Sequence, residues 1–201
     1  MRTVAILLFN EIEVLDFAGP FEVFGVTGKR TGDAAFQVFT VAESGPIYAR
    51  NGLCITPAYL LNDHPKADII IVPGGGGVHA DGTPYGSRRE MNNPAVLAWL
   101  RRVAPGAELV LSVCTGAMLL AKAGLLENLS ATTHYLATES LAQMAPTTTV
   151  LPNERYVDNG KIITSAGISA GIDMSLYAVG KLLGKEVADE TARYMQYDYW
   201  T

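Results

Sequence analysis

The stretch Glu108-Leu-Val-Leu-Ser-Val-Cys-Thr-Gly-Ala-Met-Leu-Leu-Ala121 decides the fold, because it joins a buried strand directly to a helix. Residues 109–113 are apolar and rich in Val and Leu, which is typical of a strand inside a parallel sheet. Residues 115–123 carry helix formers, and Gly124 follows them as a common residue after a helix end. Cys114 is therefore predicted to lie where the strand turns into the helix.

Cys114 has two interpretations at this junction. As a nucleophile, its thiolate would be favoured by nearby backbone N–H groups and the helix dipole, so we expect its pKa to lie below the ordinary value of about 8.5. The arrangement is analogous to the strand–nucleophile–helix turn of hydrolases. As a structural residue, it would be a core cysteine, since free cysteine is among the most buried residue types. The junction favours the nucleophile, because open parallel sheets bind ligands at the carboxyl ends of their strands.

Composition argues against several classes of protein. With 201 residues, of which 49% are hydrophobic and 17% charged, the chain predicts one domain spanning residues 1–201. The net charge of −5 and the lack of a Lys/Arg run argue against nucleic-acid binding. No apolar run approaches the ~20 residues that span a bilayer, so no membrane association is expected. Two cysteines without paired spacing, and no signal peptide, predict a cytoplasmic location.

Strands and helices alternate along the chain, which predicts an α/β fold: a flavodoxin-like three-layer sandwich with a mostly parallel central sheet. A small β excursion is expected around the Asn51-Gly52 turn, with Cys54 packed inward, and residues 84–89 are expected to form a polar loop. Strands are expected at residues 3–9, 36–42, 68–72, 109–113, 148–151, 155–157 and 161–164. Helices are expected at residues 93–103, 115–123, 138–144 and 186–197, and a long amphipathic helix is expected to follow residues 165–173 and to end at residue 183.

Two segments that follow predicted strands hold candidate polar groups. Asp16 lies among apolar residues after the first strand, and it is either a helix cap or a functional carboxylate, with Pro20 in the first turn of the helix. The run Pro73-Gly-Gly-Gly-Gly77 follows the strand at 68–72 and lacks the spacing and Lys of a phosphate loop. Its backbone N–H groups are either donors for a developing negative charge or part of a flexible turn.

Five motifs occur in order along the chain: Asp16-Phe-Ala-Gly19-Pro20, Pro73-Gly-Gly-Gly-Gly77, Ser112-Val-Cys-Thr-Gly116, Ala131-Thr-Thr-His134 and Ala166-Gly-Ile-Ser-Ala-Gly-Ile-Asp173. Together, and over essentially the whole chain, they resemble the ThiJ/PfpI branch of the class I glutamine amidotransferase-like superfamily. Within that branch the chain is most similar to the isocyanide hydratases. The same motifs also occur in the ligand-binding half of some AraC-like transcription regulators.

The chain departs from the wider superfamily directly after the cysteine. Protease-like and amidase-like members usually carry His there, whereas this chain has Thr115. Glutaminases of this fold use a later His-x-Glu pair to activate the thiol, and none of His64, His79 and His134 begins such a pair. A Cys–Asp site without an adjacent imidazole suits a reaction that delivers one proton to carbon and takes another from water.

The resemblance implies a lyase, a cysteine-dependent hydratase that converts isocyanides to N-substituted formamides. Cys114 would attack the isocyanide carbon, and Asp16, protonated beside the thiolate, would relay the proton and then activate water. His134 is interpreted more simply as a core histidine beside the site than as a catalytic one. The other site residues that the resemblance implies are Thr115, backbone groups near Gly75 and Gly76, and Ile168 as part of the pocket wall.

The resemblance leaves two other functions open. One is another cysteine chemistry of the superfamily, such as glyoxalase-type hydration of an α-oxoaldehyde. The other is a non-catalytic sensor that binds a ligand or responds to oxidation of Cys114. The chain has no Cys-x-x-Cys and no His-Glu-x-x-His, so neither a metal nor another cofactor is expected. The expected partners are a small-molecule substrate and a second copy of the chain, since members of this superfamily are usually dimers with the active site near the subunit interface.

Overall fold

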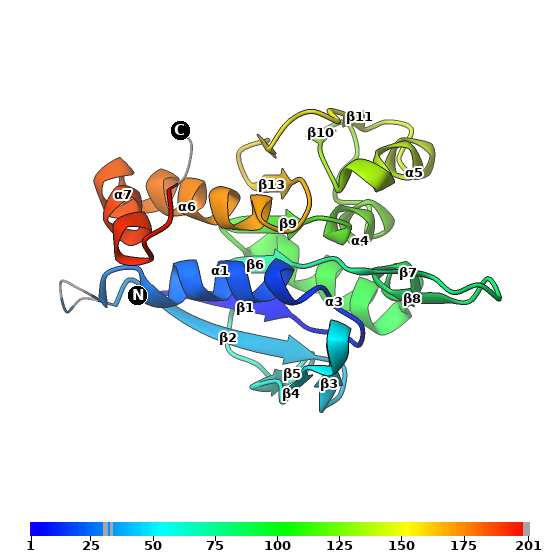
Figure 1. Ribbon diagram of the computed structural model, residues 1–201, viewed down its shortest axis with the longest axis horizontal. Coiled ribbons are helices and arrows are strands. Elements are labelled where there is room, and N and C mark those ends of the chain that lie inside the picture. The colour runs from blue at the N-terminus through cyan, green and yellow to red at the C-terminus, as the bar shows by residue number, and fades with distance from the viewer. Residues whose placement is uncertain (30–31, 33, 199–201) are drawn as a thin grey trace.

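A seven-stranded sheet in the order β12-β13-β9-β6-β1-β2-β5 organises the chain (Figure 1). The computed structural model describes residues 1–29, 32 and 34–198. All neighbouring strands of the sheet are parallel except β12 and β13. The prediction of a flavodoxin-like sandwich with a mostly parallel sheet is confirmed. The strands are β1 (Arg2–Leu7), β2 (Phe36–Ala42), β5 (Tyr59–Leu60), β6 (Ile69–Val72), β9 (Leu109–Val113), β12 (Tyr156–Asp158) and β13 (Ile162–Ser165).

Helices cover both faces of this sheet. The chain steps from β1 to β2 in one direction and from β6 to β9 and β13 in the other, so right-handed connections place α1 on one face and α3 and α4 on the opposite face. Helix α6 packs on both α1 and α7, which puts these three helices in one layer. The helices are α1 (Val14–Val26), α2 (Ser87–Glu90), α3 (Pro94–Val103), α4 (Gly116–Lys122), α5 (Thr138–Met144), α6 (Ala170–Leu183) and α7 (Lys185–Tyr194).

Within the described residues, three two-stranded sheets lie outside the main sheet. The pair β3 (Ile47–Tyr48) and β4 (Cys54–Ile55) forms the predicted hairpin, and Asn51 and Gly52 have the positive φ angles, 60° and 80°, that its turn needs. The other two pairs are β7 (Gly76–Val78) with β8 (Pro84–Gly86), which projects from the body of the molecule in Figure 1, and β10 (Ser130–Ala131) with β11 (Thr149–Val150).

Three local predictions are wrong. Pro20 lies inside α1 and not in its first turn, because the helix already begins at Val14 after the extended residue Glu13. Cys54 is exposed, since β4 belongs to a small hairpin at the surface and not to the core. The segment predicted as a polar loop, residues 84–89, instead forms β8 and most of α2, because strand pairing with β7 satisfies its backbone.

The core lies on both sides of the central strands. Residues 4–7 of β1 and all residues of β6 and β9 are buried, as expected for parallel strands covered on both faces. In the part of the chain that the structure describes, no helix is long and apolar enough to cross a membrane.

The carboxyl ends of the central strands meet at one edge of the sheet. Val72 of β6 pairs with Ser112 of β9, and Val113 of β9 pairs with Ser165 of β13. The segments that leave these strands therefore start side by side, and α1 begins near the same edge after β1. This edge is where open α/β sheets bind their ligands, and it holds the predicted site residues.

Close packing at this edge leaves no room for a side chain at position 116. A Cβ atom on Gly116 would lie 1.9 Å from the carbonyl oxygen of Val72, so Gly116→Ala should lower the free energy of unfolding by about 3 kcal/mol or more. Gly25 in α1 is the matched control, because no atom lies within 4 Å of its added Cβ. Gly25→Ala should raise stability by up to about 1 kcal/mol through helix propensity. Urea unfolding measures both changes, and equal effects would contradict this packing.

Candidate active site around Cys114

The backbone at Cys114 makes a sharp turn between β9 and α4. Its φ angle is 57°, in the left-handed region that non-glycine residues rarely adopt and that costs roughly 1–2 kcal/mol. The Cys114 N–H donates to the carbonyl oxygen of Ala166 at 3.1 Å, and its carbonyl oxygen accepts from Thr133 Oγ1 at 2.8 Å. The predicted position at a strand-to-helix junction is confirmed, and it resembles a nucleophile elbow in geometry.

Asp16 is fully buried in the first turn of α1. Its Oδ2 accepts the N–H of Gly74 at 3.0 Å, whereas its Oδ1 has no hydrogen-bond partner within the described residues. The N-cap of α1 is Glu13, and no side chain bonds to the end of the helix, so the interpretation of Asp16 as a helix cap is wrong. A buried carboxyl with a free oxygen is costly in a protein interior, which makes a functional role the better explanation.

Burial raises the pKa of Asp16 to about 7. The negative charge of Glu13 adds to this increase, while the N–H of Gly74, the Cys114 thiol and the N–H of Ile168 lower the pKa by favouring the ionised carboxylate. Near neutral pH the Asp16 carboxyl therefore exchanges readily between its protonated and ionised forms.

The expectation of a lowered pKa at Cys114 is wrong. Burial, and then the charge of the Asp16 carboxylate, raise the pKa of the thiol to about 12, because Cys114 is only 5% exposed. Donation from the backbone N–H groups of Thr115 and Ile168 and from the Thr115 side chain works in the opposite direction but is too weak to compensate. Helix α4 has only seven residues, and this limits its dipole. The thiol thus keeps its proton at neutral pH, and a neighbouring base must remove it.

Thr115 is held by a network of short hydrogen bonds. Its Oγ1 accepts the N–H of Gly75 at 3.0 Å and lies 2.7 Å from Ser87 Oγ. Ser87 Oγ also donates to the carbonyl oxygen of Gly75 at 2.6 Å. Gly76 belongs to β7 and is paired with Gly86. The Gly75 N–H therefore orients Thr115, and the backbone donors acting on Asp16 are those of Gly74 and Ile168.

Ile168 lies at the turn into α6. Its φ angle is 54°, again in the left-handed region, and its side chain is 38% exposed. Its backbone N–H favours the charged forms of both Asp16 and Cys114 and lowers the pKa of each group. The sequence predicts Ile168 as part of the pocket wall, grouped with the backbone groups of Gly75 and Gly76, and in the structure its backbone acts on the Asp16–Cys114 pair.

His134 packs against the same turn. A Cβ atom on Gly167 would lie 2.2 Å from Cδ2 of His134, so the imidazole lies directly on the backbone there. Its Nδ1 accepts the N–H of Leu136 at 3.3 Å, and burial followed by the positive charge of Arg88 lowers the pKa of His134. These contacts agree with the structural role that was favoured for His134.

Sequence reasoning missed two residues of the site. Ser87 was assigned to a polar loop, and nothing in its local pattern marks it as a partner of Thr115. Gly74 lies within the recognised glycine run, but its particular contact with Asp16 depends on how α1 meets the loop after β6. Both contacts join segments that are distant in the sequence, and such contacts leave little trace in local patterns.

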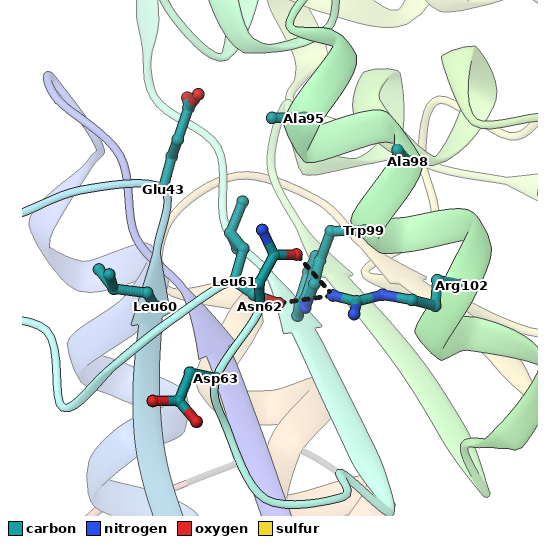
Figure 2. Close-up of a pocket in the computed structure, with 9 residues that line it drawn as sticks. All are labelled: Glu43, Leu60, Leu61, Asn62, Asp63, Ala95, Ala98, Trp99 and Arg102. Atoms are coloured by element: carbon teal, nitrogen blue, oxygen red, sulfur yellow. Dashed lines mark hydrogen bonds between the residues drawn. The ribbon is translucent and has the colours of Figure 1, made fainter.

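A surface cavity of about 520 Å³ lies elsewhere, between α3 and the β5 edge of the sheet (Figure 2). Its cation, Arg102, is already bonded to the carbonyl oxygen of Leu61 at 2.6 Å and to Asn62 Oδ1 at 3.3 Å. Strand β5 lies four positions from β9 in the sheet. The cavity holds neither Cys114 nor Asp16, so its size does not make it the site of their chemistry.

The chain is similar to several known proteins over most of its length. The DJ-1/PfpI family profile matches residues 2–181. The chain is 33% identical over 196 residues to the isonitrile hydratase of Pseudomonas putida, covering 96% of this chain and 78% of that protein. It is 28% identical to the HTH-type transcriptional regulator CdhR of Pseudomonas aeruginosa, but 90% of this chain spans only 51% of that regulator.

Solved structures show the same fold. A ThiJ/PfpI family protein from Pseudomonas syringae superposes with a TM-score of 0.85 at 27% identity, covering 100% of this chain and 76% of that one. Drosophila melanogaster DJ-1beta superposes with a TM-score of 0.80 at 21% identity, covering 98% and 99% of the two chains. On this fold and on the match over residues 2–181, the chain belongs to the DJ-1/PfpI family.

Proposed function

We propose that this protein is a lyase that hydrates isocyanides to N-substituted formamides. The observation that carries the proposal is the buried Asp16 carboxyl, with a free Oδ1, in electrostatic contact with the Cys114 thiol. The pair has no imidazole base, which fits a reaction whose proton is delivered to carbon. The 33% identity to a protein named isonitrile hydratase supports the same substrate class.

The first step forms a bond between sulfur and carbon. The ionised Asp16 carboxylate takes the thiol proton while Cys114 Sγ attacks the terminal carbon of R–N≡C. Asp16 then gives this proton to the same carbon, which leaves the neutral thioimidate R–N=CH–S on Cys114. The elevated pKa of the thiol makes this base necessary, and the elevated pKa of Asp16 makes the proton easy to hand on.

The second step consumes one water molecule. Asp16 removes a proton from the water as the water oxygen bonds to the thioimidate carbon. Asp16 then gives that proton to the nitrogen, which yields R–NH–CH(OH)–S and an ionised Asp16. The hydroxyl proton then moves to sulfur through Asp16 while the carbon–sulfur bond breaks. The products are R–NH–CHO and the free Cys114 thiol, so the site returns to its starting state.

A ligand sensor is the second candidate. The 28% identity to an HTH-type regulator favours it, because this chain matches about half of that protein. The sensor needs a binding site but no turnover, so the kinetic experiments below separate the two functions. We further propose that the protein acts in the cytoplasm as a homodimer, for which the exposed apolar side chains of Tyr135 and Leu136, 71% and 72% exposed beside His134, offer a surface.

Substitutions at the two reacting groups test the mechanism. Cys114→Ala should abolish formamide production from a simple alkyl isocyanide, because it removes the nucleophile. Asp16→Asn keeps the size of the side chain but cannot carry the proton, so turnover should fall by roughly 10² or more. Asp16→Glu keeps the carboxyl but displaces it, and it should also reduce turnover.

Cys54→Ala is the control for these variants, since Cys54 is exposed on β4 and its loss should leave the rate unchanged. Formamide is measured by chromatography. Full activity in Asp16→Asn would contradict the role of Asp16. A parent protein that binds isocyanides but hydrates none would favour the sensor.

The pH dependence of kcat/KM reports which group must ionise. Because the reaction starts with an ionised Asp16 whose pKa is about 7, kcat/KM should fall about tenfold per pH unit below pH 7. Above pH 7 it should stay level up to about pH 10, since the Cys114 thiol must remain protonated and its pKa is about 12. The residual activity of Asp16→Asn should lack the acid limb. A profile that rises between pH 7 and pH 9 would instead indicate a titrating thiol as the limiting base.

Stability should reveal the cost of burying Asp16. The folded state raises the pKa of this carboxyl, so it binds the proton more tightly than the unfolded state does, and the stability of the parent should fall as the pH rises from about 4 to about 7. Asp16→Asn should remove this loss. The free energy of unfolding of the variant, relative to that of the parent, should therefore rise by up to about 1.4 kcal/mol per pH unit over that range.

Asp68→Asn serves as a control of opposite sign. Hydrogen bonds from Thr3 lower the pKa of Asp68, so its charged form stabilises the fold, and Asp68→Asn should be less stable than the parent at pH 7. Urea unfolding at several pH values gives the free energy of unfolding of the parent and of both variants as a function of pH. Asp16→Asn less stable than the parent at pH 8 would mean that Asp16 has a structural role.

A further inference from the structure

Arg88 lies in α2 at the edge of the proposed site. Its Nη1 is 3.5 Å from Ser87 Oγ, a long and weak hydrogen bond, and Ser87 Oγ lies 2.7 Å from Thr115 Oγ1. Thr115 directly follows Cys114 in the chain. The Arg88 guanidinium is therefore connected to the residue beside the nucleophile through one serine hydroxyl. Arg88 is half-buried.

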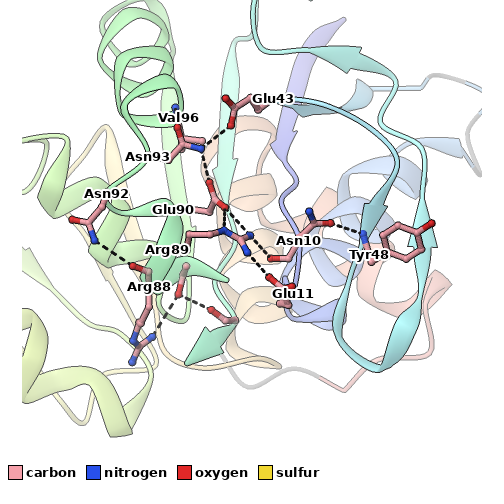
Figure 3. Close-up of polar contacts among 12 residues, drawn as sticks. Asn10, Glu11, Glu43, Tyr48, Arg88, Arg89, Glu90, Asn92, Asn93 and Val96 are labelled. Atoms are coloured by element: carbon pink, nitrogen blue, oxygen red, sulfur yellow. Dashed lines mark hydrogen bonds and ion pairs between the residues drawn. The ribbon is translucent and has the colours of Figure 1, made fainter. Parts of the chain in front are cut away.

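Arg88 differs from its neighbour in the bonds it makes. Arg89 is saturated, since it bonds to Glu11 at 2.8 Å, to Glu90 at 2.8 Å and to the carbonyl oxygen of Asn10 at 3.2 Å (Figure 3). Within the described part of the chain, Arg88 forms no ion pair, and its side chain makes one long hydrogen bond, to Ser87 Oγ. Most of its five N–H donors therefore remain available to a ligand.

The other charges near Arg88 belong to ion pairs of their own. Glu13, whose negative charge helps to raise the pKa of Asp16, is ion-paired with Arg50 at 3.0 Å, and Arg89 is ion-paired with Glu11 and Glu90. Burial and the positive charge of Arg88 lower the pKa of His134, so the guanidinium lies within electrostatic reach of the imidazole that packs on Gly167. Arg88 is thus a cation near the site whose guanidinium forms no ion pair with any described residue.

We propose that Arg88 binds an anionic group on the substrate, so that the isocyanides taken by this protein carry a carboxylate on their nitrogen substituent. A guanidinium matches a carboxylate in a planar, two-bond geometry, and the partial burial of Arg88 strengthens such a pair. The isocyanide carbon would then face Cys114 Sγ while the carboxylate points toward α2. The inference rests on the proposed function, because it places a second group of the same substrate.

The role is one of recognition and not of chemistry. Arg88 touches the substrate away from the reacting carbon, so its removal should raise KM for an anionic isocyanide more than it lowers kcat. A neutral isocyanide has nothing for Arg88 to hold, and its kcat/KM should change little. This difference separates recognition by Arg88 from a general disturbance of Thr115 or Cys114, which would slow both substrates alike.

The test compares isocyanoacetate with its methyl ester in four proteins: the parent, Arg88→Met, Arg88→Lys and Arg193→Met. The parent should prefer isocyanoacetate in kcat/KM, and Arg88→Met should lose about tenfold or more of that preference, mainly through KM. Arg88→Lys should retain part of it, because the charge remains but the two-bond geometry is lost. Arg193 is exposed on α7, so Arg193→Met removes the same net charge at a distance and should keep the full preference.

Two results would overturn the inference. One is equal kcat/KM for the acid and the ester in the parent. The other is an equal loss of preference in Arg88→Met and Arg193→Met, which would show a diffuse effect of net charge. Circular dichroism and thermal unfolding check that each variant is folded.

Calorimetric binding of both compounds to Cys114→Ala keeps the inference separate from the proposed function. Tighter binding of isocyanoacetate than of its ester, lost in a Cys114→Ala/Arg88→Met double variant, supports the anion site even where no isocyanide is hydrated. Failure of turnover then counts against the hydratase alone, and equal binding of the two compounds counts against Arg88.

Discussion

The electrostatic coupling between Asp16 and Cys114 is the constraint around which the edge of the sheet is built. Two acids buried side by side cannot both ionise without a large cost, so near neutral pH the Cys114 thiol keeps its proton while the Asp16 carboxyl titrates with a pKa of about 7. The surrounding backbone limits this cost: the N–H of Gly74 comes from the loop after β6, and the N–H of Ile168 comes from the turn into α6. The strained φ angles of Cys114 and Ile168 persist because both turns serve this one pair.

Much of the fold could be predicted from the sequence, because long segments with clear periodicity determine it. The bounds of β2 and α5 agree with the prediction, and α6 ends where Gly184 follows it. The junction at Cys114 also follows from a buried strand and a helical run that adjoin in the sequence. The errors fall on short segments such as residues 84–89, whose structure depends on a distant strand partner. Pro20 lies inside α1 because the helix begins six residues before it, at Val14.

The sequence predicts that Cys114 and Asp16 belong to the candidate site, but it does not predict their protonation states. Cys114 and Asp16 follow from their positions after strands, and the structure places both at the same edge of the sheet. The protonation state does not follow from such positions, since it depends on how deeply each group is buried and on the charge of the other. Helix-dipole reasoning alone predicted a reactive thiolate, whereas desolvation outweighs the dipole of a seven-residue helix. The role of Ser87 was hidden for a different reason, because its partner Thr115 is 28 positions away.

The contact between Gly167 and His134 couples two segments that are distant in the sequence. With Cδ2 of the imidazole only 2.2 Å from the place of a Cβ atom, position 167 can gain a side chain only if position 134 loses volume or the segment carrying it moves. Homologues should therefore show compensating changes at these two positions, with glycine retained wherever an aromatic ring faces it. Substitutions at this pair of positions would mark the lineages in which the turn next to the cysteine has been rebuilt.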